Sequence, residues 1–324
     1  MNPTFEFIQL PGHQESFCAA VWEGLSRKRK SLPCRYLYDR DGSALFEKIC
    51  ELPEYYLTRT EQAILERHAG EMVEAAGAPL SLVEFGSGSS YKTRILINAI
   101  LSRQPSLHYV PIDISADFLH LSCTELLAIY PSLSITAVAA EYSDGIAAIG
   151  PREGARLALF LGSNIGNFEP NAARSFLAGL ASALSREDSI LMGVDLVKDR
   201  RILEAAYNDA AKVTAAFNRN LLARINRELG GNFRTDRFDH AAPYNDVENR
   251  IEMLLVSSAQ QTVTIGALDY CFHFEQGEAI HTENSHKYTV GGFDKLCKEA
   301  GLRLAHSWTD SREWFAVLLL KPID

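Results

Sequence analysis

The chain has 324 residues, 47% of them hydrophobic, and a formal net charge of −9 at pH 7. This length and hydrophobic content allow a large buried core, so we expect a globular protein with one large domain or two ordinary ones. A nucleic-acid partner is not expected, because a phosphate backbone is held largely by Lys and Arg. The one basic run, "SRKRK" at residues 26–30, is typical of a solvated loop.

The cysteines and the apolar stretches indicate a cytoplasmic protein that does not cross a membrane. The six cysteines show no CxxC spacing, and the N-terminal sequence "MNPTFEFIQL" lacks the features of a signal peptide. Apolar stretches such as "WFAVLLL" at residues 314–320 are far shorter than the about 20 residues that a membrane span needs. No spacing of His, Cys and acidic residues suggests a metal site. We expect a monomer with reduced thiols and no metal.

The N-terminal part of the chain has helical patterns. "SFCAAVWEGLSRK" has apolar residues three and four apart, and "SALFEKICEL" ends at Pro53. "TRTE" at residues 58–61 has the form of a capping box before the amphipathic stretch "QAILERHAGEMVEAAG". These patterns predict three helices before residue 80.

Short apolar strands then alternate with helices. The strands are expected at residues 80–86, 108–115, 134–142, 156–163 and 189–197. Strands that are apolar nearly throughout, with helices of ten or more residues between them, predict a parallel sheet covered on both faces. The fold class is therefore α/β with a Rossmann-like core.

The rest of the chain predicts a second, smaller α+β unit and a return to the core. One long helical segment is expected at residues 201–229, extended pieces follow to residue 284, and a helix with two strands closes the chain as the antiparallel end of the same sheet. The expected division gives the core residues 61–195 plus 285–324 and the smaller unit residues 1–60 plus 196–284.

The strongest local signal is the glycine-rich turn in "LVEFGSGSSYKTR". Gly86 and Gly88 would let a ligand approach the backbone, and Asp113, 113 − 88 = 25 residues after Gly88, could hold ribose hydroxyls. Tyr91 occupies the position of the third glycine of a dinucleotide fingerprint, which disfavours a nicotinamide dehydrogenase. The pattern instead resembles class I S-adenosylmethionine-dependent methyltransferases. A tight turn that binds no ligand is the alternative.

Further segments carry a more specific resemblance, in order from about residue 31 to the C-terminus. They are "LPCRYLYDRDGSALFEKICELPEYYLTRTE", "LFLGSNIGNFEP", "DLVKD", "AAYNDAAKVTAAFNRNLLARINREL", "RIEM" and "HTENSHKY". Together they closely resemble the histidine-specific Nα-methyltransferases of ergothioneine biosynthesis. The resemblance implies transfer of three methyl groups from S-adenosyl-L-methionine to the α-nitrogen of L-histidine through its mono- and dimethyl forms. The products would be N,N,N-trimethyl-L-histidine (hercynine), the first intermediate of that pathway, and S-adenosyl-L-homocysteine.

The resemblance also assigns site residues. It implies that the smaller unit binds the substrate and that the core binds the cofactor through Gly86, Gly88, Lys92, Asp113, Glu141 and Tyr142. Glu141 and Tyr142 would lie at the adenine, where the family usually has Asp-Phe. Asn167, Tyr55 and Tyr207 would surround the amino-acid end of the substrate, with Asn167 and Tyr207 as the catalytic residues. Glu283 and Ser285 would bind the imidazole, and Met253 would line the ring pocket.

The chemistry of "HTENSHKYT" supports the imidazole assignment. Side chains two apart on a strand point to the same face, and a carboxylate beside a hydroxyl can pair with both ring nitrogens. A solvent-facing strand is the alternative for Glu283 and Ser285, and a core position is the alternative for Met253. Tyr38 and Phe46 could stabilise the growing ammonium by cation–π attraction of roughly 0.5 to 2 kcal/mol each.

Two other functions remain open from the sequence. A methyltransferase of the same fold could act on another amino acid or amine, although loss of Glu283 or Met253 would then be expected and both are present. A non-catalytic module could bind an adenosyl ligand without turnover. For the enzyme, we expect in-line displacement by the neutral α-amine, because the positive sulfur already activates the methyl group.

Overall fold

The computed structural model describes residues 4–10, 16–77, 79–88, 90–147 and 154–323. The chain forms two compact units. The first comprises Met1–Gly12, Leu57–Val197 and Tyr288–Asp324, and the second comprises His13–Tyr56 and Lys198–Lys287.

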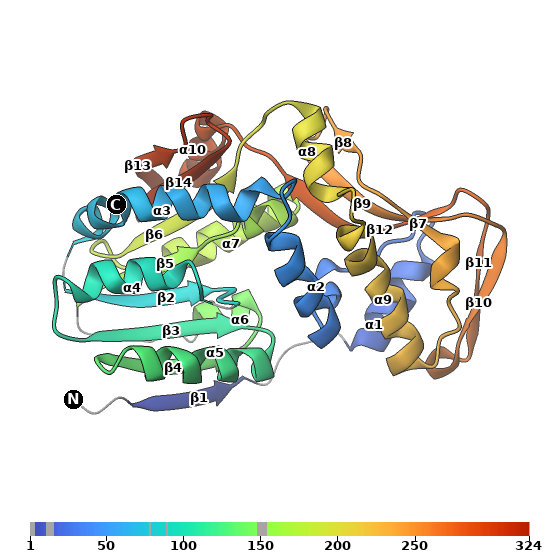
Figure 1. Cartoon of the computed structure of the whole chain (residues 1–324), viewed down its shortest axis with the longest axis horizontal. Helices are drawn as coiled ribbons and strands as arrows, with labels where there is room; N and C mark the ends of the chain where they lie inside the picture. Colours follow the sequence, from blue (N-terminus) through green and yellow to red (C-terminus); the bar gives the residue numbers. More distant parts are fainter. Residues whose placement is uncertain (1–3, 11–15, 78, 89, 148–153, 324) are drawn as a thin grey trace. The chain divides into compact units, whose positions relative to one another are not determined.

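The first unit is built on an eight-stranded sheet with the order β1-β4-β3-β2-β5-β6-β14-β13 (Figure 1). The strands are β1 Phe5–Gln9, β2 Leu80–Phe85, β3 Leu107–Asp113, β4 Leu133–Ala139, β5 Ala155–Phe160, β6 Ser189–Asp195, β13 Leu302–Thr309 and β14 Phe315–Pro322. Strands β1 to β6 pair in parallel, whereas β14 runs antiparallel to both β6 and β13. The predicted parallel sheet with an antiparallel end is confirmed.

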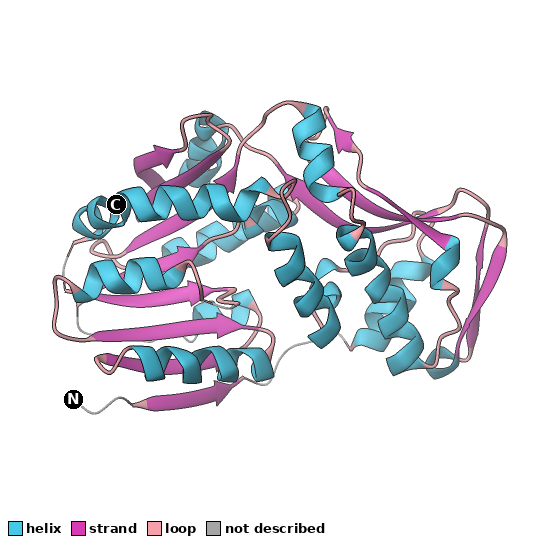
Figure 2. Ribbon diagram, in the orientation of Figure 1, coloured by secondary structure: helices cyan, strands magenta, loops and turns pink. Residues whose placement is uncertain are grey.

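Helices cover both faces of this sheet, as expected for strands that are buried on both sides (Figure 2). The bounds are α3 Tyr56–Ala76, α4 Thr93–Leu101, α5 Ala116–Ile129, α6 Tyr142–Ala147, α7 Pro170–Ala183 and α10 Val290–Glu299, with the short 3₁₀ turn η2 at Asn164–Asn167. All seven residues of β6 are buried. Phe176 of α7 and Phe293 of α10 lie in the core cluster with residues of the sheet. This is the doubly wound, Rossmann-like core that the sequence predicts.

The N-terminal segment differs from the prediction, which placed residues 1–60 in the smaller unit and expected helices first. Phe5–Gln9 instead adds a parallel edge strand beside β4, with Phe5 opposite Ile135. Its burial pattern is mostly exposed, as expected at an edge. A short strand whose partner lies far along the chain has little local signal in its sequence, which explains the error.

Two helix boundaries were also wrong. Helix α3 begins at Tyr56, so Thr58 lies inside the helix and does not cap it. The single helix expected at residues 201–229 is two helices, α8 Arg200–Tyr207 and α9 Val213–Leu229. The Asp209 carboxylate accepts hydrogen bonds from the backbone N–H groups of Val213 and Thr214, both at 2.8 Å, and so caps α9.

The second unit combines helices with small antiparallel sheets. Its helices are α1 Phe17–Ser26, α2 Arg40–Cys50, α8 and α9, with 3₁₀ turns η1 Cys34–Leu37, η3 Thr235–Arg237 and η4 Gly266–Leu268. Its strands are β7 Phe238–Ala241, β8 Tyr244–Asn245, β9 Arg250–Ser257, β10 Gln261–Ile265, β11 Tyr270–Phe274 and β12 Ala279–His286. Strands β12, β9 and β7 are neighbours, β8 pairs with β9, and β10 pairs with β11. No helix in the described part of the chain is both long and apolar enough to span a bilayer.

Candidate active site

The glycine-rich turn of the first unit follows β2, and its backbone conformation requires glycine at position 86. Gly86 and Gly88 have φ angles of +72° and +48°, which disfavour any residue with a side chain. A Cβ atom on Gly86 would lie 2.7 Å from the Tyr142 hydroxyl oxygen and 3.3 Å from the Asn164 amide nitrogen. The turn therefore brings bare backbone beside two polar side chains.

Asp113 lies at the end of β3 and faces this turn. Its carboxylate accepts hydrogen bonds from the backbone N–H of Gly88 at 3.1 Å and of Ser115 at 3.0 Å. Burial raises the pKa of Asp113, and these backbone hydrogen bonds act against that rise. Because a carboxylate oxygen can accept more than one hydrogen bond, capacity remains for two ribose hydroxyls. This geometry fits an adenosyl ligand.

Lys92 pairs with Glu61, a residue that the sequence analysis did not assign to the cofactor or substrate site. Glu61 is fully buried and also accepts the backbone N–H of Gly162 at 2.9 and 3.0 Å. The Lys92 side chain is 22% exposed, so its ammonium can reach a ligand while Glu61 holds it. Glu61 belongs to "TRTE", whose capping-box interpretation assigned it a purely local role. Its buried ion pair fixes a cation beside the glycine turn.

The other predicted residues of the first unit lie around the same edge of the sheet. The Tyr142 ring packs against Phe85 and Phe160, with ring centroids 6.3 and 5.1 Å away. Tyr142 thus contributes to the core as well as to the turn. Glu141 directly precedes α6, and Asn167 ends η2 after β5; both are half-buried. Asn164, in the same 3₁₀ turn as Asn167, was missed although it stands in "GSNIGN".

In the second unit, three polar side chains form a buried cluster. The Tyr207 hydroxyl oxygen lies 2.7 Å from Ser285 Oγ, and Lys287 Nζ donates to Ser285 Oγ at 2.7 Å and to the Tyr207 hydroxyl at 3.1 Å. All three residues are buried. Tyr207 was expected at the amino-acid end of the substrate. Its hydroxyl instead lies beside Ser285, the side chain predicted to bind the imidazole ring. Lys287 was not predicted, because a lysine near a strand end is usually solvated.

Glu283 is buried and lies directly opposite Met253 in the β12–β9 pair. Residues directly opposite in an antiparallel pair share one face of the sheet. Burial raises the pKa of Glu283 to about 7, and the nearby positive charge of Lys287 opposes this rise. Its Oε2 atom accepts no hydrogen bond from any residue that the structure describes. The alternative of a solvent-facing strand is therefore wrong. A buried carboxylate oxygen that accepts no hydrogen bond from the described residues suits a ligand that donates a hydrogen bond to it.

Aromatic rings extend from this cluster in an unbroken series of edge contacts. Ring centroids are 5.5 Å apart for Tyr38 and Phe46, 6.2 Å for Phe46 and Tyr55, and 6.0 Å for Tyr55 and Tyr207. The pKa of Tyr55 is raised by burial and further by the neighbouring Tyr207. The structure thus brings together all the aromatic residues that the sequence assigned to the substrate.

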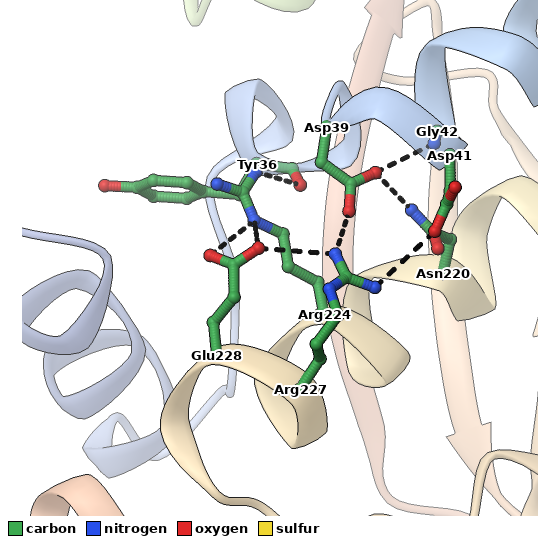
Figure 3. A network of polar contacts seen from close by, with 8 residues as sticks. All are labelled: Tyr36, Asp39, Asp41, Gly42, Asn220, Arg224, Arg227 and Glu228. Atoms are coloured by element: carbon green, nitrogen blue, oxygen red, sulfur yellow. Dashed lines mark hydrogen bonds and ion pairs between the residues drawn. The ribbon is translucent and has the colours of Figure 1, made fainter.

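A polar network fastens the segment that carries Tyr38 and Phe46 onto α9 (Figure 3). The Asp39 carboxylate accepts from the backbone N–H of Gly42 at 2.8 Å and from Asn220 Nδ2 at 2.7 Å, and it pairs with Arg227. Arg224 donates to the backbone carbonyl of Tyr36 at 3.0 Å. Asp39 is next to Tyr38 in the chain, so these contacts hold the aromatic series in place.

Comparison with known proteins decides the family. The histidine-specific, S-adenosylmethionine-dependent methyltransferase family matches residues 17–322. The chain belongs to this family. It is 45% identical over 299 residues to histidine N-alpha-methyltransferase of Mycolicibacterium smegmatis and 43% identical to that of Mycobacterium tuberculosis, each match covering 92% of both chains. It is 30% identical to ergothioneine biosynthesis protein 1 of Neurospora crassa, covering 90% of this chain and 33% of that protein.

This histidine-specific methyltransferase therefore has two sets of candidate residues. The first unit carries those predicted for the cofactor, together with Asn167. The second unit carries those predicted for the substrate ring and its surroundings: Tyr38, Phe46, Tyr55, Tyr207, Met253, Glu283 and Ser285. Among the described residues, no group of three or more His, Cys, Asp or Glu side chains could hold a metal ion.

Proposed function

We propose that the protein transfers three methyl groups in succession from S-adenosyl-L-methionine to the α-amino nitrogen of L-histidine. The product is hercynine, the first intermediate of ergothioneine biosynthesis. The observation that carries this proposal is the buried Glu283 carboxylate, one oxygen of which accepts no hydrogen bond from the described residues, on the same strand as the buried Ser285 hydroxyl. Membership of the histidine-specific family supports the same substrate.

Glu283 accepts a hydrogen bond from the imidazole N–H. The neighbouring hydroxyls of Ser285 and Tyr207 form a hydrogen bond with the other ring nitrogen. An apolar side chain in this place would leave a buried polar group unpaired, at a cost of roughly 1 to 3 kcal/mol, more when the group is charged. Met253 lies opposite Glu283 in the strand pair, and we assign it to the apolar side of the ring pocket. Histidine is thereby favoured over amino acids of similar size.

In the first unit, the bare protein backbone at Gly86 leaves room for the cofactor. Asp113 accepts hydrogen bonds from the ribose hydroxyls of the cofactor. Lys92, held by Glu61, pairs with the carboxylate of its methionine part. Glu141 and Tyr142 lie nearest the adenine. The methyl donor is bound as a co-substrate and leaves as S-adenosyl-L-homocysteine.

Asn167 binds the amino-acid end of histidine, because its amide can accept from the amine and donate to the carboxylate. The lone pair of the neutral α-amine forms the new N–C bond, while the S–C bond breaks and its electrons remain on sulfur. A proton passes from the methylated amine to water before each further transfer. The third transfer leaves a quaternary ammonium, whose charge is stabilised by the faces of Tyr38 and Phe46.

A cytoplasmic location is also proposed, since the six cysteines form no disulfides in the structure and suit a reducing compartment.

The test is mass spectrometry of the standard amino acids after incubation with the purified protein and S-adenosyl-L-methionine. We expect histidine alone to gain one, two and finally three methyl groups. Modification of a different amino acid would favour the alternative of another amine substrate. Cofactor binding without any modified product would favour a non-catalytic adenosyl-binding module.

A further inference from the structure

Asn218 of α9 is a fully buried amide that the proposed reaction does not use. Its Nδ2 atom donates to the backbone carbonyl of Leu254 at 3.1 Å and lies 3.0 Å from His240 Nδ1. Its Oδ1 atom accepts from the Thr282 hydroxyl at 2.7 Å. A carbonyl oxygen can only accept, so Leu254 determines which end of the amide faces it. The amide therefore has one possible orientation, with its nitrogen toward His240.

This orientation fixes the tautomer of His240. Because Asn218 presents an N–H group to Nδ1, that ring nitrogen is the acceptor and the ring hydrogen is on Nε2. Nε2 donates to the backbone carbonyl of Tyr207, the last residue of α8, at 2.8 Å. Burial lowers the pKa of His240; the hydrogen bond to Tyr207 and the charge of Asp209 oppose this fall, and the charge of Arg219 adds to it. The neutral ring thus ties the end of α8 to β7 and α9.

The oxygen of the same amide holds a β-bulge in β12. His281 and Glu283 lie opposite adjacent residues of β9, so Thr282 between them is an extra residue of β12. The buried Thr282 hydroxyl donates to Asn218 Oδ1 at 2.7 Å and lies 3.1 Å from the backbone carbonyl of Met253. A bulge changes the direction of the side chains beside it. The bulge therefore determines how Glu283 points from the strand.

We propose that Asn218 and His240 are positioning residues that hold Tyr207 and Glu283 in the arrangement that binds histidine. One series of hydrogen bonds runs from the Tyr207 carbonyl through His240 and Asn218 to Thr282, the neighbour of Glu283. Loss of one member leaves the next with an unpaired polar atom away from water, which favours rearrangement of the whole series. This inference rests on the proposed function, which assigns Tyr207 and Glu283 to the substrate.

The first test is Asn218→Asp, which keeps an acceptor for Thr282 but removes both amide donors. We expect KM for histidine to rise at least about tenfold, which corresponds to about 1.4 kcal/mol, while kcat at saturation changes less. Affinity for S-adenosyl-L-homocysteine should stay the same in calorimetry. Asn226→Asp is the matched control in α9: its amide accepts from the backbone N–H of Phe233 at 2.7 Å and donates to the carbonyl of Phe233 at 2.8 Å. The control loses a donor and keeps an acceptor in the same way, and its KM should not change.

The protonation of His240 separates this role from a general loss of stability. In the unaltered protein at about pH 6.5, where an ordinary histidine is half protonated, ¹⁵N NMR should show His240 mainly neutral with its hydrogen on Nε2. In Asn218→Asp the new carboxylate accepts from Nδ1, so we expect both ring nitrogens to be protonated at the same pH. The signal is assigned by its loss in His240→Gln. A hydrogen on Nδ1 of the neutral ring in the unaltered protein would overturn the proposal.

Two variants of His240 test the series independently if Asn218→Asp does not fold. His240→Leu removes both hydrogen bonds, and we expect KM for histidine to rise at least about tenfold. His240→Gln keeps one acceptor and one donor, so it should recover most of this loss. Equal KM values for these two variants, or equal KM values for Asn218→Asp and Asn226→Asp, would overturn the proposal. Failure of the unaltered protein to bind histidine would instead contradict the proposed function, so the two failures are distinguishable.

Discussion

Glu283 of β12 and Met253 of β9 lie directly opposite each other, so a carboxylate and a thioether share one buried face of the second unit. This pairing places a strong acceptor beside an apolar surface, the combination that a flat, polar ring requires. The predicted consequences of this relationship concern both recognition and stability.

Replacing Glu283 should separate recognition from cofactor binding. Glu283→Gln keeps the shape but removes the charge, and we expect KM for histidine to rise roughly 10- to 100-fold, since hydrogen bonds to charged groups contribute about 1.5 to 3 kcal/mol. Affinity for S-adenosyl-L-homocysteine should stay the same in calorimetry. Met253→Leu, a change of similar volume on the same face, should raise KM much less. Equal effects of the two variants would contradict the role of the carboxylate.

The same substitution should change the pH dependence of stability. Burial raises the pKa of Glu283 to about 7 from the ordinary 4.5, so the folded state holds a proton that the unfolded state releases. Its ionisation therefore lowers the free energy of unfolding as pH rises from about 4.5 to about 7. We expect Glu283→Gln to be more stable than the unaltered protein at pH 8, by roughly 1 to 3 kcal/mol, and to lose most of this advantage at pH 5. Urea unfolding at both pH values measures this, and an advantage independent of pH would contradict it.

Gly193 of β6 should tolerate no side chain, because a Cβ atom there would lie 2.0 Å from Glu61 Oε1. Gly193→Ala must displace the buried Glu61 carboxylate, and we expect a loss of stability of roughly 1 to 3 kcal/mol or more together with weaker cofactor binding. Gly70→Ala is the control: Gly70 lies exposed in α3 with nothing within 4 Å of its Cβ position, and it should gain roughly 0.5 to 1 kcal/mol. Thermal unfolding with and without the cofactor distinguishes the two. A harmless Gly193→Ala would refute the proposed role of Glu61.

Gly86→Ala should weaken cofactor binding because of its positive φ angle and the nearby Tyr142 hydroxyl. Tyr142→Phe removes that hydroxyl, so the double variant should recover part of the affinity that Gly86→Ala loses. The strain of the φ angle would remain, and recovery should be incomplete. Calorimetric titration with S-adenosyl-L-homocysteine measures all three variants. Full recovery, or none, would show that only one of these two causes operates.

The aromatic series should matter most for the last methyl transfer. Replacing Tyr38 and Phe46 together with leucine removes two ring faces near the growing ammonium, and we expect the final transfer to slow by roughly 2- to 30-fold per ring, with dimethylhistidine accumulating. Phe217→Leu is the control, since Phe217 packs against both rings but was not assigned to the substrate. Unchanged progression from mono- to trimethyl product in the double variant would remove the cation–π role.

The sequence predicted the parallel core because each of its strands is marked by its own apolar residues and by the helices beside it. It could not predict β1, whose pairing depends on a distant strand, or the break between α8 and α9, which depends on the Asp209 cap. Glu61 was misassigned for a related reason. The capping-box pattern "TRTE" gave Glu61 a local role at a helix start. Its ion pair with Lys92 forms only when the chain folds.

The candidate site shows the same limit. The alternation in "HTENSHKYT" predicted that Glu283 and Ser285 share a face, but burial of the strand is a tertiary property. The contact of Lys287 with Tyr207 joins two segments 80 residues apart in the chain. The local spacing of residues in the sequence therefore could not predict it. Assignment of individual residues to the cofactor and to histidine remains a prediction that substitution must test.

The most direct test of the central claim is NMR of the product that the unaltered protein makes from ¹⁵N-labelled histidine and S-adenosyl-L-methionine carrying a ¹³C-labelled methyl group. We predict three equivalent methyl groups coupled to the α-nitrogen and an unmodified imidazole ring. Methyl groups on a ring nitrogen, or none on histidine while the cofactor binds, would contradict the roles assigned to Glu283 and Ser285.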